Sequence, residues 1–195
     1  MLAKFRKPII ITLLVVLAIS YYIYLTRRDV NNTDKMASES KQLEVLSRDM
    51  SKNYPKDYYE VVEYFEKIQK TAYKEKLSED EIVGCVQHLR ALISDELLLQ
   101  KDNDYDSYLA RFKEEIERYR ENDRYINDFQ IQKRRGIKQY VLDGKSFAEV
   151  HVKYFIREGG KLIVMYEKYT LRKESDSKWK ILYWEISDGT EMKDE

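Results

Sequence analysis

The two histidines, His88 and His151, are the residues best suited to acid or base chemistry near neutral pH. His151 alternates with Glu149 and Lys153, while the positions between them are apolar, so we expect it to face solvent or the less apolar side of a strand. His88 stands one position off an apolar helical stripe. A catalytic imidazole also needs an orienting partner in a cleft, and the sequence indicates none. We therefore predict no catalytic residue.

The last apolar run, residues 179–186, contains a carboxylate in apolar company. Read as a strand, it places Glu185 on one face with Trp179 and Tyr183, where burial would raise the pKa of the carboxyl group. A small pocket enzyme of the isomerase or dehydratase type, with Glu185 or His151 as its base, is thus an alternative. We favour an ion pair of Glu185 at the strand end.

The opposite face of the same run is apolar as well, with Trp184 at its centre. Helices can cover only one face of a strand, so the other needs a second cover, for which a homodimer or an envelope protein partner is the natural hypothesis. The predicted ligand or partner face consists of Trp179, Tyr183, Trp184, Glu185 and His151.

The acidic run DNDYD at residues 102–106 imitates the start of a calcium loop. Ser107 stands where a glycine should turn the chain, and Lys113 stands where a bidentate glutamate should close the site. Acids near a helix N-terminus explain the run more simply, as caps. Cys85 is the only cysteine, which excludes an intramolecular disulfide and a thiolate metal centre. We predict no metal and no cofactor.

An uncharged segment near the start, residues 8–25, predicts where the protein works. Its 18 residues would span about 27 Å as a helix, close to the hydrocarbon thickness of a bilayer. The triplet Ala18-Ile19-Ser20 also suits a signal peptidase, but the aromatic residues before Arg27 favour a retained anchor. More basic residues before the segment than after it predict a cytoplasmic N-terminus and an extracytoplasmic domain.

The remaining chain predicts one α+β domain. Helical periodicity marks residues 56–74, a second helix from the Ser78 capping box through Leu97, and a third from 104 to 122. Strand patterns follow at residues 125–133, 137–142, 147–156, 162–171 and 179–186, joined by short polar turns. We expect three helices on a bent antiparallel sheet of four to five strands, with 125–142 either a hairpin or one bent strand. The predicted divisions are an anchor (1–28), a polar tether with a possible short helix (29–52), the domain (53–188) and an acidic tail (189–195).

Two resemblances extend this interpretation. The ending YTLRKESDSKWKILYWEI resembles the last hairpin of the nuclear-transport-factor-2-like cone fold. The stretches SRDMSKNYPKDYYEVVEYF and LRALISDELL are similar to a family of single-pass membrane proteins of Gram-positive bacteria whose function is unknown. The cone resemblance implies a bent sheet around N-terminal helices. It selects no activity, because that fold hosts enzymes, adaptors and secretion-complex subunits.

Charge narrows the partners. Residues 29–195 carry 30 basic and 35 acidic side chains, a net charge of −5. A region with this net negative charge lacks the basic surface that nucleic-acid binding requires, and we predict no nucleic-acid partner. The sequence as a whole predicts a non-enzymatic, membrane-anchored binding domain at the bacterial cell envelope, with an assembly subunit of an envelope secretion or transfer complex as a further alternative.

Overall fold

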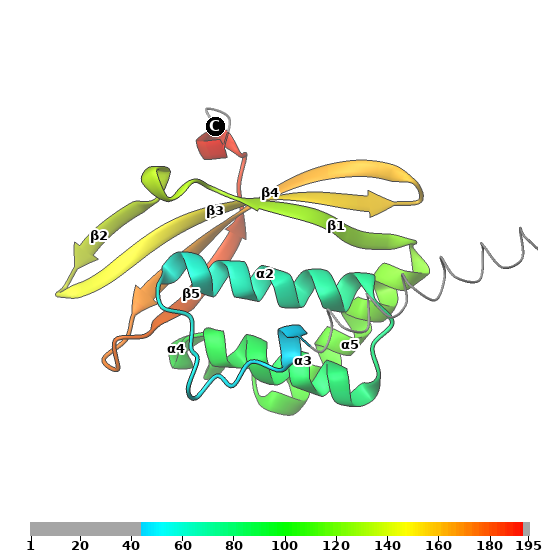
Figure 1. Cartoon of the computed structure of the whole chain (residues 1–195), viewed down its shortest axis with the longest axis horizontal. Helices are drawn as coiled ribbons and strands as arrows, with labels where there is room; N and C mark the ends of the chain where they lie inside the picture. The colour runs from blue at the N-terminus through cyan, green and yellow to red at the C-terminus, as the bar shows by residue number, and fades with distance from the viewer. Residues whose placement is uncertain (1–43, 193–195) are drawn as a thin grey trace, which may run out of the picture. The chain divides into compact units, whose positions relative to one another are not determined.

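The computed structural model describes residues 44–192, which form helices against an antiparallel sheet (Figure 1). The helices are α2 (Tyr58–Lys74), α3 (Glu79–Leu92), α4 (Asp95–Leu98) and α5 (Tyr105–Glu121). The strands are β1 (Arg124–Ile131), β2 (Lys138–Leu142), β3 (Lys145–Glu158), β4 (Lys161–Lys173) and β5 (Trp179–Ile186). The predicted α+β class and the antiparallel sheet of five strands are confirmed.

Side-chain caps define where the long helices begin. Asp57 accepts a hydrogen bond from the backbone of Glu60 at the start of α2, and Ser78 and Glu81 form the predicted capping box of α3. Asp104 accepts from the backbone N–H of Ser107 at 3.0 Å and caps α5. Among residues 44–192, no group of acidic, histidine or cysteine side chains could hold a metal ion.

The second predicted helix is shorter than expected. Instead of continuing through Leu97, it ends at Leu92, because Ile93 adopts an extended conformation and forms a parallel bridge with Ile181 of β5. The backbone N–H of Ser94 donates to the carbonyl of Ile181 at 2.9 Å, and the Ser94 side chain then caps the short helix α4. The apolar period continues through this break, so the sequence pattern did not reveal it.

The sheet has the order β1-β3-β4-β5, and β2 also pairs with β3. Strands β1 and β2 lie end to end along one edge of β3, against residues 152–158 and 145–149 respectively. Residues 125–142 therefore do not form a hairpin. The arrangement is close to the bent-strand alternative, with a 3-10 turn at Arg134–Gly136 as the bend.

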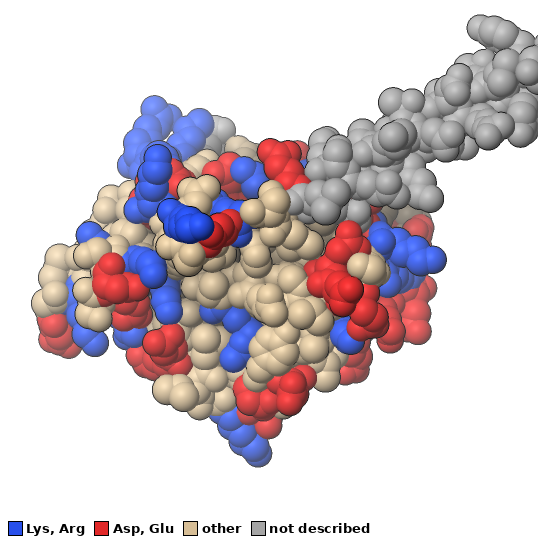
Figure 2. Space-filling view, turned by 60° about the horizontal axis from the view of Figure 1, so that its bottom comes forward, with Lys and Arg blue, Asp and Glu red and all other residues tan. Residues whose placement is uncertain are grey.

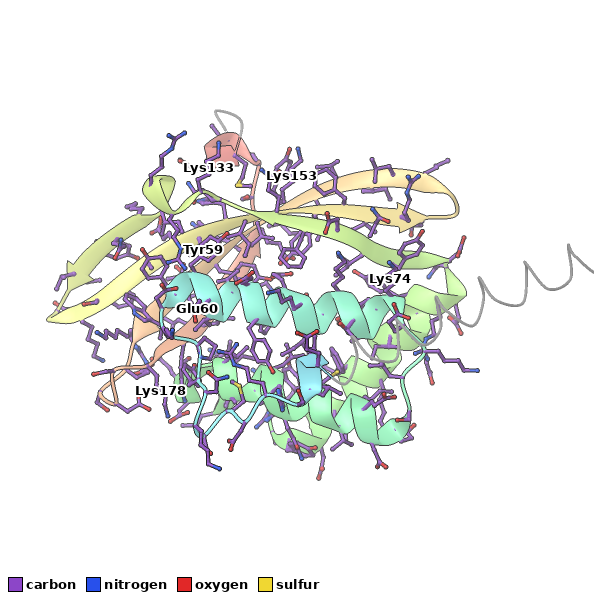
Figure 3. The ribbon with its side chains drawn as sticks, in the orientation of Figure 1. Tyr59, Glu60, Lys74, Lys133, Lys153 and Lys178 are labelled. Atoms are coloured by element: carbon purple, nitrogen blue, oxygen red, sulfur yellow. The ribbon has the colours of Figure 1, made fainter. Side chains whose placement is uncertain are left out.

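The two faces of the sheet have different environments. Even-numbered residues of β3 from Ala148 to Ile156 pack into the core beneath α2 and the other helices. Lys153 lies on the side away from α2, as Figure 3 shows by comparison with Tyr59 and Glu60. The 3-10 turn Thr190–Met192 packs against β3. We call the two sides the helix face and the outer face.

A bulge in β5 changes the predicted faces of the last strand. Thr170 pairs with Tyr183 but Leu171 pairs with Ile181, so Leu182 is an extra residue. Alternation is reset at that point, and Trp184 joins Trp179 and Ile181 on the helix face. Glu185 and Tyr183 lie on the outer face, so the prediction that Glu185 shares a face with Trp179 is wrong.

No helix among residues 44–192 has the length and apolar character needed to cross a membrane. The predicted anchor at residues 8–25 lies outside the described residues, as does most of the predicted tether. Residues 44–46 are helical, within the region where a short helix was expected.

Candidate functional site

The five residues of the predicted face do not gather in one place. Trp179 is buried edge-on against Tyr58, and Trp184 lies beside Phe65 and Tyr169, with ring centroids 5.8 and 6.1 Å away. The remaining three residues, His151, Tyr183 and Glu185, lie on the outer face. Helix α2 thus contacts both tryptophans, but Trp184 keeps 37% exposure, so the predicted second cover over Trp184 stays a prediction.

His151 is more enclosed than predicted. It retains 9% exposure, because the turn Thr190–Met192 packs against β3 on the side where the imidazole lies. Burial lowers the pKa of His151 and outweighs the nearby acid Glu191, and its Nδ1 atom has no hydrogen-bond partner within the described chain. Of the two placements predicted for His151, solvent or the less apolar face of the sheet, the structure shows the second.

Glu185 forms an ion pair with Lys168 across β4 and β5, with 2.6 Å between carboxylate and ammonium. The side chain of Glu185 is about half exposed. This is the ion pair at the strand end that the sequence favoured. It leaves no desolvated carboxylate at Glu185 to act as a base.

His88 of α3 belongs to a hydrogen-bonded group that connects α2, α3 and the segment that precedes α2. Its Nδ1 lies 2.6 Å from the hydroxyl of Tyr64, which also donates to the carbonyl of Val45 at 2.8 Å. A tyrosine has one hydroxyl proton, so donation to Val45 requires His88 to donate from Nδ1. Burial and the nearby Arg48 lower the pKa of His88, so the imidazole is neutral and carries its single proton on Nδ1.

A buried group of carboxyls and phenols, which the sequence did not reveal, lies between α2 and the sheet. We call Glu66, Tyr154, Glu167 and Tyr169 the acid–tyrosine cluster. Glu66 follows Val62 by one helical turn, and that spacing within the apolar stripe of α2 was the available signal. Its side chain is fully buried, as is that of Tyr169.

Hydrogen bonds connect all four members of the cluster. The hydroxyl of Tyr154 lies 2.7 Å from Oε1 of Glu66, 3.0 Å from Oε2 of Glu167 and 2.7 Å from the hydroxyl of Tyr169. Tyr169 in turn lies 2.8 Å from the same Oε2 of Glu167. Strand alternation explains the grouping, because Glu167 and Tyr169 share the helix face of β4. On β3, Tyr154 lies opposite Met165 and is therefore the diagonal neighbour of Glu167.

Proton counting favours a neutral Glu66. The two phenols supply two protons, which is too few for the four close oxygen contacts, and Oε2 of Glu66 has no partner among the described residues. Burial raises the pKa of Glu66 to about 8, and the nearby Glu167 adds to the rise. Burial also raises the pKa of Glu167. A proton on Glu66 raises the number of donors from two to three for these four contacts and leaves Glu167 as the single negative charge of the cluster.

The cluster reaches solvent on one side only. Glu167 is half-buried, whereas Glu66, Tyr154 and Tyr169 are enclosed by core side chains. Such an arrangement can store a proton, pass it along hydroxyl groups, or fix α2 on the sheet. A neutral carboxyl beside phenols is also a hydrogen-bond donor set of the kind that stabilises a developing oxyanion.

A second feature lies at the far end of β4. Strand β5 pairs with β4 only from Glu167 onward, so residues 161–165 have no neighbour on that side within the described chain. Figure 1 shows the β3–β4 hairpin continuing past the end of β5. Leu162, Ile163 and Val164 are 52%, 37% and 42% exposed. We call residues 161–165 the β4 edge.

Comparison with known families gives one match, which covers most of the chain. A family model described as a domain of unknown function, DUF6715, matches residues 2–184. The chain belongs to the DUF6715 family. The DUF6715 match includes the acid–tyrosine cluster and the β4 edge, and it ends at Trp184, before Glu185. No curated protein matches the sequence.

Proposed function

We propose that this DUF6715 protein is a non-enzymatic, membrane-anchored binding protein whose α+β domain faces outward at a bacterial cell envelope. The anchor rests on the apolar segment at residues 8–25 and on the basic residues around it. We also propose that the bent sheet and its helices form a cone of the nuclear-transport-factor-2-like type. The resemblance of the final hairpin supports this.

The β4 edge is the observation that carries the binding proposal. Exposed strands with unpaired backbone groups and apolar side chains pair with other chains, and soluble proteins usually protect them. Figure 2 brings the helix side of the domain forward, and there acidic and basic residues are interspersed with uncharged ones. A short edge of backbone and aliphatic groups suits another protein chain, since it offers hydrogen bonds in strand geometry.

A photo-crosslinking residue at Val164 of the full-length protein in bacterial cells tests the binding proposal. We expect a protein adduct at Val164 and none from the same residue at Lys101, which is exposed in the loop before α5. Irradiation that yields only uncrosslinked monomer would overturn it. Protease added outside intact cells should digest the domain, and protection until lysis would overturn the outward orientation.

A small pocket enzyme remains the second candidate, because the acid–tyrosine cluster favours it. The role that the sequence gave to Glu185 or His151 would pass to Glu66 as a hydrogen-bond donor or acid, together with Tyr154. Phenol is a suitable probe, since its hydroxyl matches the cluster and its ring matches the aromatic surroundings. We expect enzyme-like access to appear as a phenol-dependent shift of the Glu66 carboxyl carbon signal in NMR. An unchanged signal at saturating phenol would count against this candidate.

A further inference from the structure

The backbone of the β4 edge has a defined direction. Ser187 donates its N–H to the carbonyl of Tyr166 at 2.9 Å, so the polar groups of Tyr166 point away from β3. Backbone groups alternate in direction along a strand, and therefore Leu162 and Val164 point outward as well. Neither has a strand partner on that side among residues 44–192.

We propose that a second copy of this chain pairs with the β4 edge, antiparallel, with Ile163 on the two-fold axis. The inference deepens the proposed function, because it names the occupant of the same surface. In this register Leu162 of one copy faces Val164 of the other, so each outward residue exchanges both of its backbone hydrogen bonds. A register centred on Val164 would use Tyr166, whose carbonyl is already bonded to Ser187.

Side-chain chemistry favours a second copy over an unrelated strand. Ile163 would meet its symmetry mate on the helix face, and Leu162 would meet Val164 on the outer face, so aliphatic groups face each other throughout. Lys161 would oppose Met165 of the second copy and have Glu167 of that copy as its diagonal neighbour, within reach of a long side chain.

Those two charges lack an ionic partner within one copy. Lys161 forms no ion pair with the described residues, and the hydrogen-bond partners of Glu167 are tyrosine hydroxyls. Antiparallel pairing brings Lys161 of each copy next to Glu167 of the other, so the pair forms twice in the dimer, once at either end of the shared edge. The interface is short, so we expect dimers in membranes, where an anchor confines the copies, more than in dilute solution.

Cysteine crosslinking of the full-length protein in membranes tests the proposal. Residues that face each other on a two-fold axis at a non-hydrogen-bonded position have Cα atoms about 4.5 Å apart, within the range for a disulfide. We expect Ile163→Cys to form a disulfide-linked dimer on mild oxidation. Native Cys85 can stay, because it is buried and burial raises the pKa of its thiol to about 12.

Register controls sharpen the test. Leu162→Cys and Val164→Cys should each crosslink poorly alone but should form a heterodimer when two differently tagged variants are co-expressed. Leu142→Cys, exposed at the end of β2, is the matched surface control and should not crosslink. Equal crosslinking of Ile163→Cys and Leu142→Cys would indicate random collision and would overturn the proposal.

Val164→Pro in the Ile163→Cys protein separates edge pairing from side-chain proximity. It removes an outward N–H that the described fold does not use, so the thermal transition should be unchanged. We expect the dimer fraction to fall about tenfold, because two hydrogen bonds are lost per dimer. An undiminished dimer would overturn the pairing. A Val164 photo-adduct to a different protein, without an Ile163 disulfide, would overturn the second copy yet leave the proposed function intact, whereas loss of both signals would reject both.

Discussion

The hydroxyl of Tyr154 lies 2.7 Å from Oε1 of Glu66 and thereby joins the middle of β3 to the buried face of α2. Glu66 occupies a position that a helix packed on a sheet normally gives to an apolar residue. Its presence links the stability of the fold to protonation, because ionisation of a buried carboxyl group lowers the unfolding free energy of the protein.

Glu66→Gln tests this linkage. A carboxyl group whose folded pKa is raised contributes stability below its unfolded pKa near 4.5 and loses that contribution as pH rises to about 8. We therefore expect the unfolding free energy of the native protein to fall with pH in this window, at up to about 1.4 kcal/mol per pH unit. Urea unfolding at several pH values measures the slope. It should flatten in Glu66→Gln, and an equal slope in both proteins would contradict the assignment.

Tyr154→Phe removes the hydroxyl that contacts every other member of the cluster. We expect a loss of about 1 to 3 kcal/mol in unfolding free energy, since buried acceptors are left without their donor. The pKa of Glu66 should rise further, because the hydrogen bond from Tyr154 lowers it in the native protein. Tyr183→Phe is the matched control, as Tyr183 is exposed, and it should change stability little. Similar losses in the two variants would show that the cluster contributes nothing special.

Truncation after Ser187 tests the cover over His151. The turn Thr190–Met192 packs against β3, and burial is the largest cause of the lowered pKa of His151. Removal of the turn should let the pKa rise toward the ordinary value of about 6.5. Proton NMR titration of the two imidazoles reads this directly, with His88 as the internal control because it lies on α3. A pKa of His151 that stays unchanged would contradict the proposed cover.

Glu185→Gln should have little effect. The ion pair with Lys168 is partly exposed at the surface, and such pairs contribute about 0.2 to 1 kcal/mol at low salt. We expect that contribution to vanish in concentrated salt, where native protein and variant should unfold at the same urea concentration. A loss of several kcal/mol, or one that salt does not reduce, would show that Glu185 has a role beyond the ion pair.

Local signals predicted the elements well. The Ser78 capping box, the apolar stripe of α2 and the short polar turns between strands act over a few residues, so their outcome does not depend on the rest of the chain. The predicted end of α3 was wrong because it depends on a distant part of the chain. Ile93 leaves the helix because a backbone partner in β5, far along the sequence, competes with the next helical hydrogen bond.

The candidate sites show the same division. The sequence by itself determined the α+β class, the helix starts, the single cysteine and the apolar character of the last strand. Only the tertiary structure decided that a bulge at Leu182 turns Trp184 and Glu185 to opposite faces, and that Glu66 meets Tyr154 in the core. Sequence periodicity shows which positions are polar and which are apolar. Whether a buried carboxyl group has a hydrogen-bond partner, and whether a strand edge is paired, depends on other elements of the fold.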